Sequence, residues 1–399
     1  MNLRILFVDD ERYVLDGLRR ILRPFRHQWQ ADFALGPLEA LELLEKARET
    51  NPPDVVVSDM RMPVMDGAQL LAEVRARIPG SVRLLLSGQC EPGAIGRGAE
   101  FAHQFLSKPC EAEVLRTALA WVGAIRQRLP GGRFREFIHT LRALPVLPEH
   151  AEFITPSGEE ARLSAEEVAA TLAKIAQQDV GFATKVMQLA STGFFGRPLR
   201  AITPAEAIAA LGLKEVRRLG VDAENQGKVA ESPLLLALLR QINLYSAQLA
   251  REVESAAREA GLPDSVLAHA YCAGMFRGVG IIVLAMYDPE VYGQILEAAL
   301  REARPRQTLL ALEVEAFGAD HPTAGAYLLA LWGIPEAVVD AIVAHAEVSP
   351  SVLWQASSSH AKELHEFLQR GSRRCSSIFD YLAQCMSTSS SGERGDRFN

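Results

Sequence analysis

The stretch Val55–Gly67, VVVSDMRMPVMDG, decides how the first part of this chain folds. Its run of valines before Ser58 is typical of a central parallel strand that is buried on both faces. Asp59 then falls at the carboxyl end of that strand, the edge where open α/β sheets carry their chemistry. An earlier strand, ILFVDD, ends on Asp9 and Asp10. Two strand ends therefore bring three carboxylates to one crevice.

Strand and helix patterns alternate through residues 1–129, which we predict to be one domain. Each predicted strand is followed by apolar residues at helical spacing, and Gly36-Pro37 and Gly67 open two of the helices. Five such units predict an α/β fold with a five-stranded parallel sheet and helices on both faces. The predicted strands are 4–10, 29–35, 55–59, 82–88 and 104–109.

Polar residues also follow the later strands of this predicted sheet. Ser87 comes at the end of the fourth strand and Lys108 at the end of the fifth. Clustered carboxylates repel one another, which favours a bound cation, and oxygen-only ligands suit Mg²⁺. A lysine and a hydroxyl facing the same crevice can bind the oxygens of a phosphoryl group.

The order of these residues resembles the receiver domain of two-component response regulators, a flavodoxin-like fold typified by CheY. The pattern includes Pro63 four residues after Asp59, Gly67 eight residues after it, and the pair Lys108-Pro109. The resemblance implies that Asp59 accepts a phosphoryl group from a sensor histidine kinase or a phosphotransfer protein. It further implies the roles of the surrounding residues: Mg²⁺ ligands Asp9, Asp10, Asp59 and the backbone carbonyl of Arg61, phosphoryl contacts Ser87 and Lys108, and the switch residue Phe105.

Residues 130–132, Pro-Gly-Gly, predict a short linker. From Arg133 onward helical spacing replaces the strand pattern, and capping boxes begin helices at Ser164 and at Thr203. An all-α domain is therefore predicted over 133–350. In the remainder, 351–399, a helix is predicted at 352–369 and the polar end is expected to be disordered.

Four segments of this second part together resemble the HDOD domain, an output or interaction module related to the HD metal-dependent phosphohydrolases. They are LPVLP at 144–148, 179–196, 201–219 and 317–345. HD hydrolases hold metal with histidine and aspartate ligands. Here the place of the His-Asp pair carries Arg277 and Gly278, and that of an earlier histidine carries Tyr245. His321 and His345 are interpreted as structural, so we predict no metal and no hydrolase activity in this domain.

Charge and cysteine content set the class of protein. Residues 1–130 hold 17 basic and 17 acidic residues and the rest hold 25 and 32, so the net charge of -7 lies in the second part. An acidic domain argues against nucleic-acid binding. The cysteines are odd in number and widely spaced, the chain starts directly with a strand, and no unbroken apolar run reaches the ~20 residues of a membrane helix. We expect a reduced, cytoplasmic protein without a membrane segment.

The sequence predicts a response regulator whose phosphorylation controls protein–protein interaction through a non-catalytic output domain. Its downstream partner is open, and a homodimer is one possibility. Two alternatives remain. One is an HD-type phosphohydrolase or cyclic-dinucleotide phosphodiesterase output. The other is a DNA-binding transcriptional regulator, because residues 202–220 superficially resemble a helix-turn-helix with Lys214, Arg217 and Arg218 in its second half. The apolar residues Ala205, Ala209 and Leu213 favour packing for that segment instead.

Overall fold

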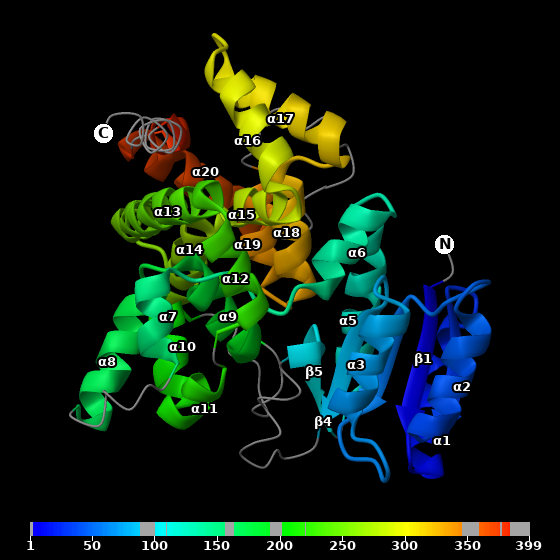
Figure 1. Cartoon of the computed structure of the whole chain (residues 1–399). Coiled ribbons are helices and arrows are strands. Elements are labelled where there is room, and N and C mark those ends of the chain that lie inside the picture. Colours follow the sequence, from blue (N-terminus) through cyan, green and yellow to red (C-terminus); the bar gives the residue numbers. More distant parts are fainter. Residues whose placement is uncertain are drawn as a thin grey trace, which may run out of the picture.

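The computed structural model describes residues 3–87, 100–108, 110–155, 163–191, 202–219, 221–344, 359–375 and 377–383. A parallel sheet with its helices forms the first part, and a helical part follows it and packs against it (Figure 1). This confirms the predicted fold class, an α/β domain followed by a helical region. His345 and the polar end from 384 lie outside the described residues.

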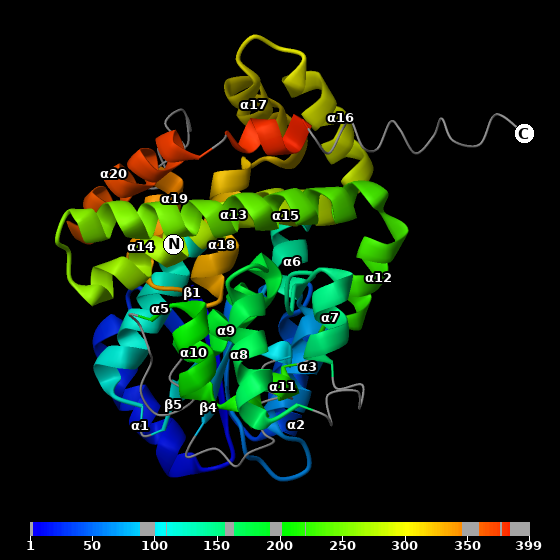
Figure 2. The same cartoon turned by 90° about the vertical axis from the view of Figure 1, so that its left-hand side faces the viewer.

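Five parallel strands form one sheet in the order β2-β1-β3-β4-β5. The central strand β3 is buried along its whole length, as its valines predict. Figure 2 shows α1 and α5 on one face of the sheet and α2 and α3 on the other. The elements are β1 (Leu3–Asp9), α1 (Arg12–Leu22), η1 (Arg23–Phe25), β2 (Trp29–Leu35), α2 (Pro37–Ala47), β3 (Val55–Asp59), α3 (Gly67–Arg77), β4 (Val82–Ser87), β5 (Gln104–Ser107) and α5 (Ala112–Arg126).

The described residues from 133 onward are organised as helices, with the long helix α13 lying across the others (Figure 2). Both predicted capping boxes are present, since Ser164 accepts from the backbone of Glu167 and Thr203 from that of Glu206. The helices are α6 (Arg133–Thr140), α7 (Pro148–Ile154), α8 (Ala165–Ala176), α9 (Val180–Ser191), α10 (Pro204–Leu211), α11 (Leu213–Arg218), α12 (Ala223–Glu231), α13 (Pro233–Glu259), α14 (Asp264–Phe276), α15 (Val279–Tyr287), α16 (Pro289–Leu300), α17 (Pro305–Phe317), α18 (His321–Leu331), α19 (Glu336–Ala344) and α20 (Ser359–Arg374).

Helix α9 is buried on all sides, and a buried aspartate fastens it. Asp179 precedes the helix and is 0% exposed. Its carboxylate accepts hydrogen bonds from the backbone N–H groups of Phe182 at 3.0 Å and Leu147 at 2.9 Å. It also accepts from Nδ1 of His150 at 2.9 Å. These bonds tie the start of α9 to the segment 144–148, so two of the motifs noted in the sequence form one contact.

Helix α10 packs through a different face from the predicted one. Ala207, Ile208 and Leu211 are buried, whereas Ala209 is exposed. The prediction of an apolar face through Ala205 and Ala209 was therefore wrong. The segment AEAIAAL is apolar nearly all round, and periodicity cannot choose a face there until α8 and α9, against which α10 packs, are in place.

The stretch Asp264–Tyr287 meets the length and hydropathy of a membrane span, contrary to the expectation that no stretch would. The expectation considered only unbroken apolar runs, and Arg277 breaks this one. The mean hydropathy of the stretch is nevertheless high enough for a membrane span. In the structure 89% of the span's apolar window is buried. The stretch folds as α14 and α15 and belongs to the core of the helical part.

The helix predicted at 352–369 is observed as α20, from Ser359 to Arg374. It packs against α13, α14 and α19. Leu364 and Leu368 are 0% exposed in that contact. The helix therefore extends the helical part beyond the predicted domain end at 350.

Candidate functional site

The three predicted carboxylates meet at the carboxyl edge of the sheet. Asp9 ends β1, Asp59 ends the neighbouring β3, and Asp10 follows β1 directly. Their ligand atoms all lie within 4.8 Å of one another. Asp9 is 1% and Asp59 7% exposed. The adjacency of β1 and β3 brings together residues that are 50 positions apart in the chain.

Lys108 lies between two of these carboxylates. Its Nζ is 2.7 Å from Oδ2 of Asp9 and 2.5 Å from Oδ1 of Asp59. Burial raises the pKa of Asp59, and the hydrogen bond and charge of Lys108 oppose that rise. Burial lowers the pKa of Lys108, but its bonds to Asp59 and Asp9 outweigh this and raise it above the ordinary value. The positive charge of Lys108 thus offsets part of the free-energy cost of burying two negatively charged carboxylates.

The turn after β3 explains why the stretch Val55–Gly67 ends with Asp66 and Gly67. Asp66 caps α3 by accepting from the backbone of Gln69, whose side chain bonds back to Asp66 N–H. Gly67 N–H donates to the carbonyl of Met60 at 2.9 Å. A Cβ at Gly67 would lie 2.1 Å from the backbone oxygen of Asp59. Only glycine lets the first turn of α3 approach the strand end that carries Asp59.

The remaining receiver residues lie near the predicted positions. Ser87 ends β4, beside Ser107 of β5, but its side chain is outside the described residues. Phe105 lies on β5 and is 1% exposed. The backbone N–H of Arg61 donates to Oδ2 of Asp59 at 3.2 Å. The role of the Arg61 carbonyl as a ligand stays a prediction.

The donor set fits Mg²⁺. Three carboxylates from two adjacent strand ends offer oxygen atoms close enough to share one cation, and oxygen ligands are what Mg²⁺ prefers. Asp10, the most open of the three, leaves the edge accessible to water and to a phosphate oxygen. The cluster is therefore suited to hold a divalent cation.

In the helical part, two residues that stand at the places of HD metal ligands, Tyr245 and Arg277, line one pocket together with His321. Tyr245, Arg277 and His321 come from three different helical segments and meet there. Gly278 packs elsewhere: a Cβ on it would lie 2.5 Å from Cγ2 of Ile242. His321 donates from Nδ1 to the buried Glu313 at 2.8 Å, which agrees with the interpretation of this histidine as a hydrogen-bonded group.

The contact between the two parts was not predicted, and it uses polar residues of β5 and α5. The side-chain amide of Gln104 donates to the carbonyls of Ala330 at 3.2 Å and Leu331 at 3.1 Å. Trp121 Nε1 also donates to Ala330, at 3.3 Å, and Gln188 donates to the carbonyl of His103 at 3.2 Å. The only sequence signal was a polar pair, His103 and Gln104, at the start of a strand expected to be buried.

A buried polar network continues this contact. Nδ1 of His103 accepts from the backbone N–H of Arg83 at 3.0 Å, so Nε2 carries the proton and donates to the carbonyl of His139 at 2.9 Å. Arg83 donates to the same carbonyl at 2.6 Å. The ring of His139 is hydrogen bonded to the hydroxyl of Tyr327 at 2.7 Å. Strand β4, helix α6 and helix α18 are thereby linked through buried groups.

Two family models match the chain. The response regulator receiver domain matches residues 5–120 and the HDOD domain matches residues 144–348. The first match contains Asp9, Asp10, Asp59, Ser87 and Lys108. The second contains the pocket residues up to Ile342, while α20 lies beyond it.

Individual similar proteins cover about 30 to 40% of the chain. The chemotaxis protein CheY of Listeria monocytogenes is 30% identical over 121 residues, which are 29% of this chain and 95% of the relative. The transcriptional regulatory protein GlrR of Escherichia coli is 31% identical over 157 residues, 38% of this chain and 34% of the relative. A solved receiver domain of an HD domain-containing protein from Pseudomonas fluorescens is 29% identical, with a TM-score of 0.28, and covers 31% of this chain and 99% of that one.

Proposed function

This chain belongs to the HDOD domain family and carries a response regulator receiver domain ahead of the HDOD domain, and from this premise we propose that it is a phosphorylation-controlled interaction protein. The receiver accepts a phosphoryl group on Asp59 from a sensor histidine kinase or a phosphotransfer protein. The HDOD domain acts as a non-catalytic output that binds a downstream protein partner. The protein works in the cytoplasm, without a membrane segment or nucleic acid as partner.

One observation supports the phosphoacceptor assignment above all others. Lys108 bridges Asp9 and Asp59 at the strand edge, with Asp10 beside them. In the proposed step a carboxylate oxygen of Asp59 attacks the phosphorus of a phosphohistidine. The O–P bond forms, the N–P bond breaks, and its electron pair stays on the imidazole nitrogen of the donor. Lys108, already within hydrogen-bond reach of Asp59, then contacts the phosphoryl oxygens, and Ser87 at the neighbouring strand end contacts another.

Magnesium would be held by Asp9, Asp10 and Asp59, with the Arg61 carbonyl as a further ligand. When bound, it neutralises the negative charge that the carboxylates and the phosphoryl group bring together. The protein's own part is to hold the nucleophile in place. The Arg61 N–H bond to Oδ2 and the contact of Lys108 with Oδ1 fix both oxygens of Asp59. A fixed nucleophile lowers the entropic part of the barrier.

The signal passes to the HDOD domain through β5. Phosphorylation adds about 1.5 to 2 negative charges at the crevice, which draws Lys108 and Ser87 inward. Lys108 follows β5 directly, and Phe105 and Gln104 lie on that strand. Repacking of Phe105 would shift the strand whose Gln104 holds the end of α18. The contact between the domains is therefore the element that two receiver states would bias.

The output is proposed to be non-catalytic because the residues at the HD ligand positions are unsuitable for metal. Arginine and tyrosine stand where histidine and aspartate ligands are needed, and glycine offers no ligand at all. The edge of the receiver at β5 already contacts α18 within one chain. A homodimer would therefore form through another surface, and a partner protein would meet the HDOD domain.

Incubation with acetyl phosphate and Mg²⁺, followed by intact-mass measurement, tests the phosphoacceptor. The wild-type chain is expected to gain one phosphoryl group, which hydroxylamine removes from an acyl phosphate. Asp59→Asn is expected to gain none, because an amide is not a nucleophile at this position. Asp32→Asn, on the opposite sheet edge in β2, serves as the matched control and should behave as wild type. A phosphorylated Asp59→Asn protein would show that the site assignment is wrong.

A further inference from the structure

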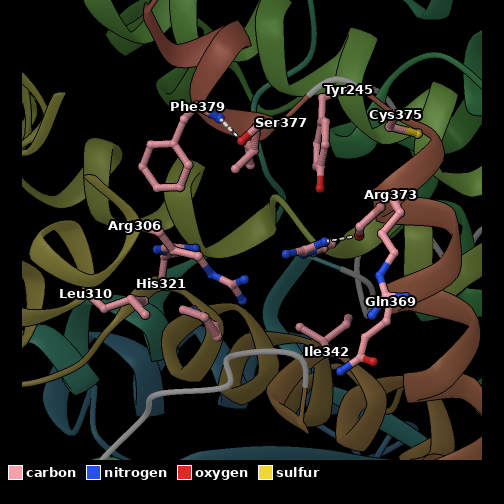
Figure 3. A pocket seen from close by; sticks show the side chains of 14 residues that line it. Tyr245, Arg306, Leu310, His321, Ile342, Gln369, Arg373, Cys375, Ser377 and Phe379 are labelled. Atoms are coloured by element: carbon pink, nitrogen blue, oxygen red, sulfur yellow. Dashed lines mark hydrogen bonds between the residues drawn. The ribbon is translucent and has the colours of Figure 1, made fainter. Parts of the chain in front are cut away.

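The pocket of the helical part has a volume of about 380 Å³ and lies outside the receiver. Its lining comes from α13, α17, α18, α19 and α20, from Arg277 just after α14, and from the residues just after α20 (Figure 3). Pockets of this size accommodate small organic ligands. Its chemistry is not used by the phosphoacceptor reaction.

Three arginines from distant parts of the chain line this pocket. Arg277 follows α14, Arg306 lies on α17 and Arg373 lies on α20. Arg277 donates from Nη1 to Oγ of Ser372 at 2.6 Å, which fixes one guanidinium at the wall. Guanidinium groups have the donor geometry that binds the oxygens of a phosphate, so three of them lining one pocket suit an anionic group.

Neutral polar groups face the same space. In Figure 3 the hydroxyl of Tyr245 and the guanidinium of Arg306 point toward the centre of the pocket. Tyr245 is 2% exposed. Burial raises the pKa of its hydroxyl, and the charges of Arg277 and Arg306 oppose that rise. The phenol therefore remains a protonated hydrogen-bond donor at neutral pH.

His321 is held by a buried carboxylate behind it. Glu313 is 0% exposed and accepts from Nδ1 of His321 at 2.8 Å, from its backbone N–H at 2.8 Å, and from the hydroxyl of Tyr292 at 2.9 Å. With Nδ1 bound to Glu313, the ring has Nε2 left for a ligand. A carboxylate that orients an imidazole in this way fixes which nitrogen meets the ligand.

Apolar side chains form another part of the lining. Leu310, Ile342, Ile378 and Phe379 form part of the wall. A small inorganic anion would leave this surface without contacts. A ligand that combines an anionic group with a flat or apolar body would use both kinds of wall, since aromatic side chains stack on ring systems and arginines bind phosphate bidentately.

We propose that this pocket binds a phosphate ester of nucleotide size, with the phosphate among Arg277, Arg306 and Arg373 and the ring system against Phe379 and Ile342. The HDOD domain then senses a small molecule in a pocket that carries arginine and tyrosine instead of metal ligands. This site lies apart from Asp59, and binding to it does not require the proposed phosphorylation.

Calorimetric titration of the full chain tests the proposal, with adenosine and guanosine 5′-monophosphates, the matching nucleosides and inorganic phosphate as probes. EDTA in the buffer keeps phosphate and metal from combining at the receiver carboxylates. At least one monophosphate is expected to bind about tenfold or more tightly than its nucleoside and than phosphate alone, with affinity that falls as salt rises. Failure of both monophosphates to bind at millimolar concentration would overturn the proposal.

Two arginines on or next to α17 supply a matched pair of variants. Arg306→Gln should weaken monophosphate binding about tenfold or more, because it removes a charged donor from the pocket. Arg304→Gln changes an exposed arginine two residues away that does not line the pocket and should bind as wild type. Thermal unfolding of both variants checks that they fold alike. Equal loss of affinity in the two variants, or none in Arg306→Gln, would contradict the placement of the phosphate.

A third variant separates the two ends of the ligand. Phe379→Ala should weaken binding of the monophosphate and leave inorganic phosphate unchanged, because only the ring system contacts the aromatic wall. If phosphate alone binds as tightly as the monophosphates, the pocket takes a simple anion and the nucleotide-sized ligand is wrong.

Discussion

Gly67 illustrates at the scale of one residue how the receiver site is built. The residue is the first of α3, and its missing side chain leaves room for the backbone oxygen of Asp59. Asp66 caps the same helix. A reactive carboxylate at a strand end therefore depends on a neighbour with no side chain at all, because the helix that follows must start immediately beside it.

Replacing Gly67 by alanine should destabilise the receiver by about 3 kcal/mol, the upper end of what overpacking usually costs. The added Cβ would lie 2.1 Å from a backbone atom, which cannot move as a flexible side chain would. Urea unfolding followed by far-UV circular dichroism measures this, and acetyl phosphate labelling of Asp59 should slow in parallel.

Gly17 provides the matched control. It lies within α1, and a Cβ there would meet nothing within 4 Å. Gly17→Ala should be neutral or stabilising by up to about 1 kcal/mol, because alanine favours a helix more than glycine does. Equal stability of Gly67→Ala and wild type would show that the close approach at Asp59 is unimportant.

His103 and His139 are the second residue-scale feature. Burial, above all, lowers the pKa of both imidazoles well below the ordinary value, and nearby arginines add to the effect. Arg83 acts on His103, and Arg126 acts on His139. Both rings are therefore neutral in the folded protein at neutral pH, whereas in the unfolded chain they protonate as the pH falls through about 6.5.

The sign of the pH dependence follows from this difference. Below about pH 6.5 the unfolded state binds more protons than the folded state, so stability falls on acidification by up to about 1.4 kcal/mol per pH unit for each histidine. His103→Gln should lose one histidine's share of that slope between pH 7.5 and 5.5 in urea unfolding. Exposed His27 is the control site, and His27→Gln should keep the wild-type slope. An unchanged slope in His103→Gln would contradict the neutral, buried imidazole.

At the scale of elements, buried aspartate and close glycine contacts order the helices. Asp179 caps the start of α9 through the N–H of Phe182 and joins it to Leu147, just before α7, and to His150 on α7. Helices α15 and α18 cross so closely that a Cβ on Gly280 would lie 1.7 Å from the carbonyl oxygen of His321. Asp179 and Gly280 therefore serve the packing of the helices, because a buried capping carboxylate and a missing side chain permit these close approaches.

Substituting alanine for Asp179 should destabilise the helical part by roughly 2 to 4 kcal/mol, since the change leaves buried backbone N–H groups without an acceptor. Ser164→Ala removes the exposed cap of α8 and should cost only about 1 kcal/mol. Chemical unfolding of the two variants measures the difference. Similar losses would mean that Asp179 acts as an ordinary helix cap.

At the scale of the whole molecule, α18 connects the receiver to the proposed ligand pocket. His321, at its first residue, lines the pocket, and the carbonyls of Ala330 and Leu331 at its other end accept from Gln104 of β5. Because both sites contact one rigid helix, a shift of β5 on phosphorylation would reach the pocket. By linkage, a ligand that binds one receiver state better would also favour phosphorylation of that state.

Gln104→Ala tests this connection by removing both hydrogen bonds to α18. Acetyl phosphate should still label Asp59, because the side chain does not touch the carboxylates. In wild type, labelling is expected to change hydrogen exchange of α18 amides, and in Gln104→Ala that change should be lost or reduced. Gln30→Ala, at the exposed opposite edge of the sheet, should respond as wild type. A full α18 response in Gln104→Ala would rule out this route.

The sequence alone determined the α/β alternation, the strand ends and the carboxylates that gather at the sheet edge, because strand period, valine content and glycine or proline punctuation are local signals. It also predicted a helical second part and assigned Tyr245 and Arg277 to places where HD hydrolases carry metal ligands. The sequence could not predict which face of α10 is buried. Alanines occur on most sides of this helix, so the buried face depends on the helices that pack against it.

Only the tertiary structure decided where those residues meet. Arg277, Arg306 and Arg373 are far apart in the chain, and no periodicity relates them, so their convergence into one pocket follows from helix packing. The contact between Gln104 and the end of α18 likewise follows from packing, because the two are more than 200 residues apart in the chain. Local patterns fix what each segment becomes, whereas contacts between distant segments depend on the packing of the whole chain, and the pocket and the interdomain contact are made of such contacts.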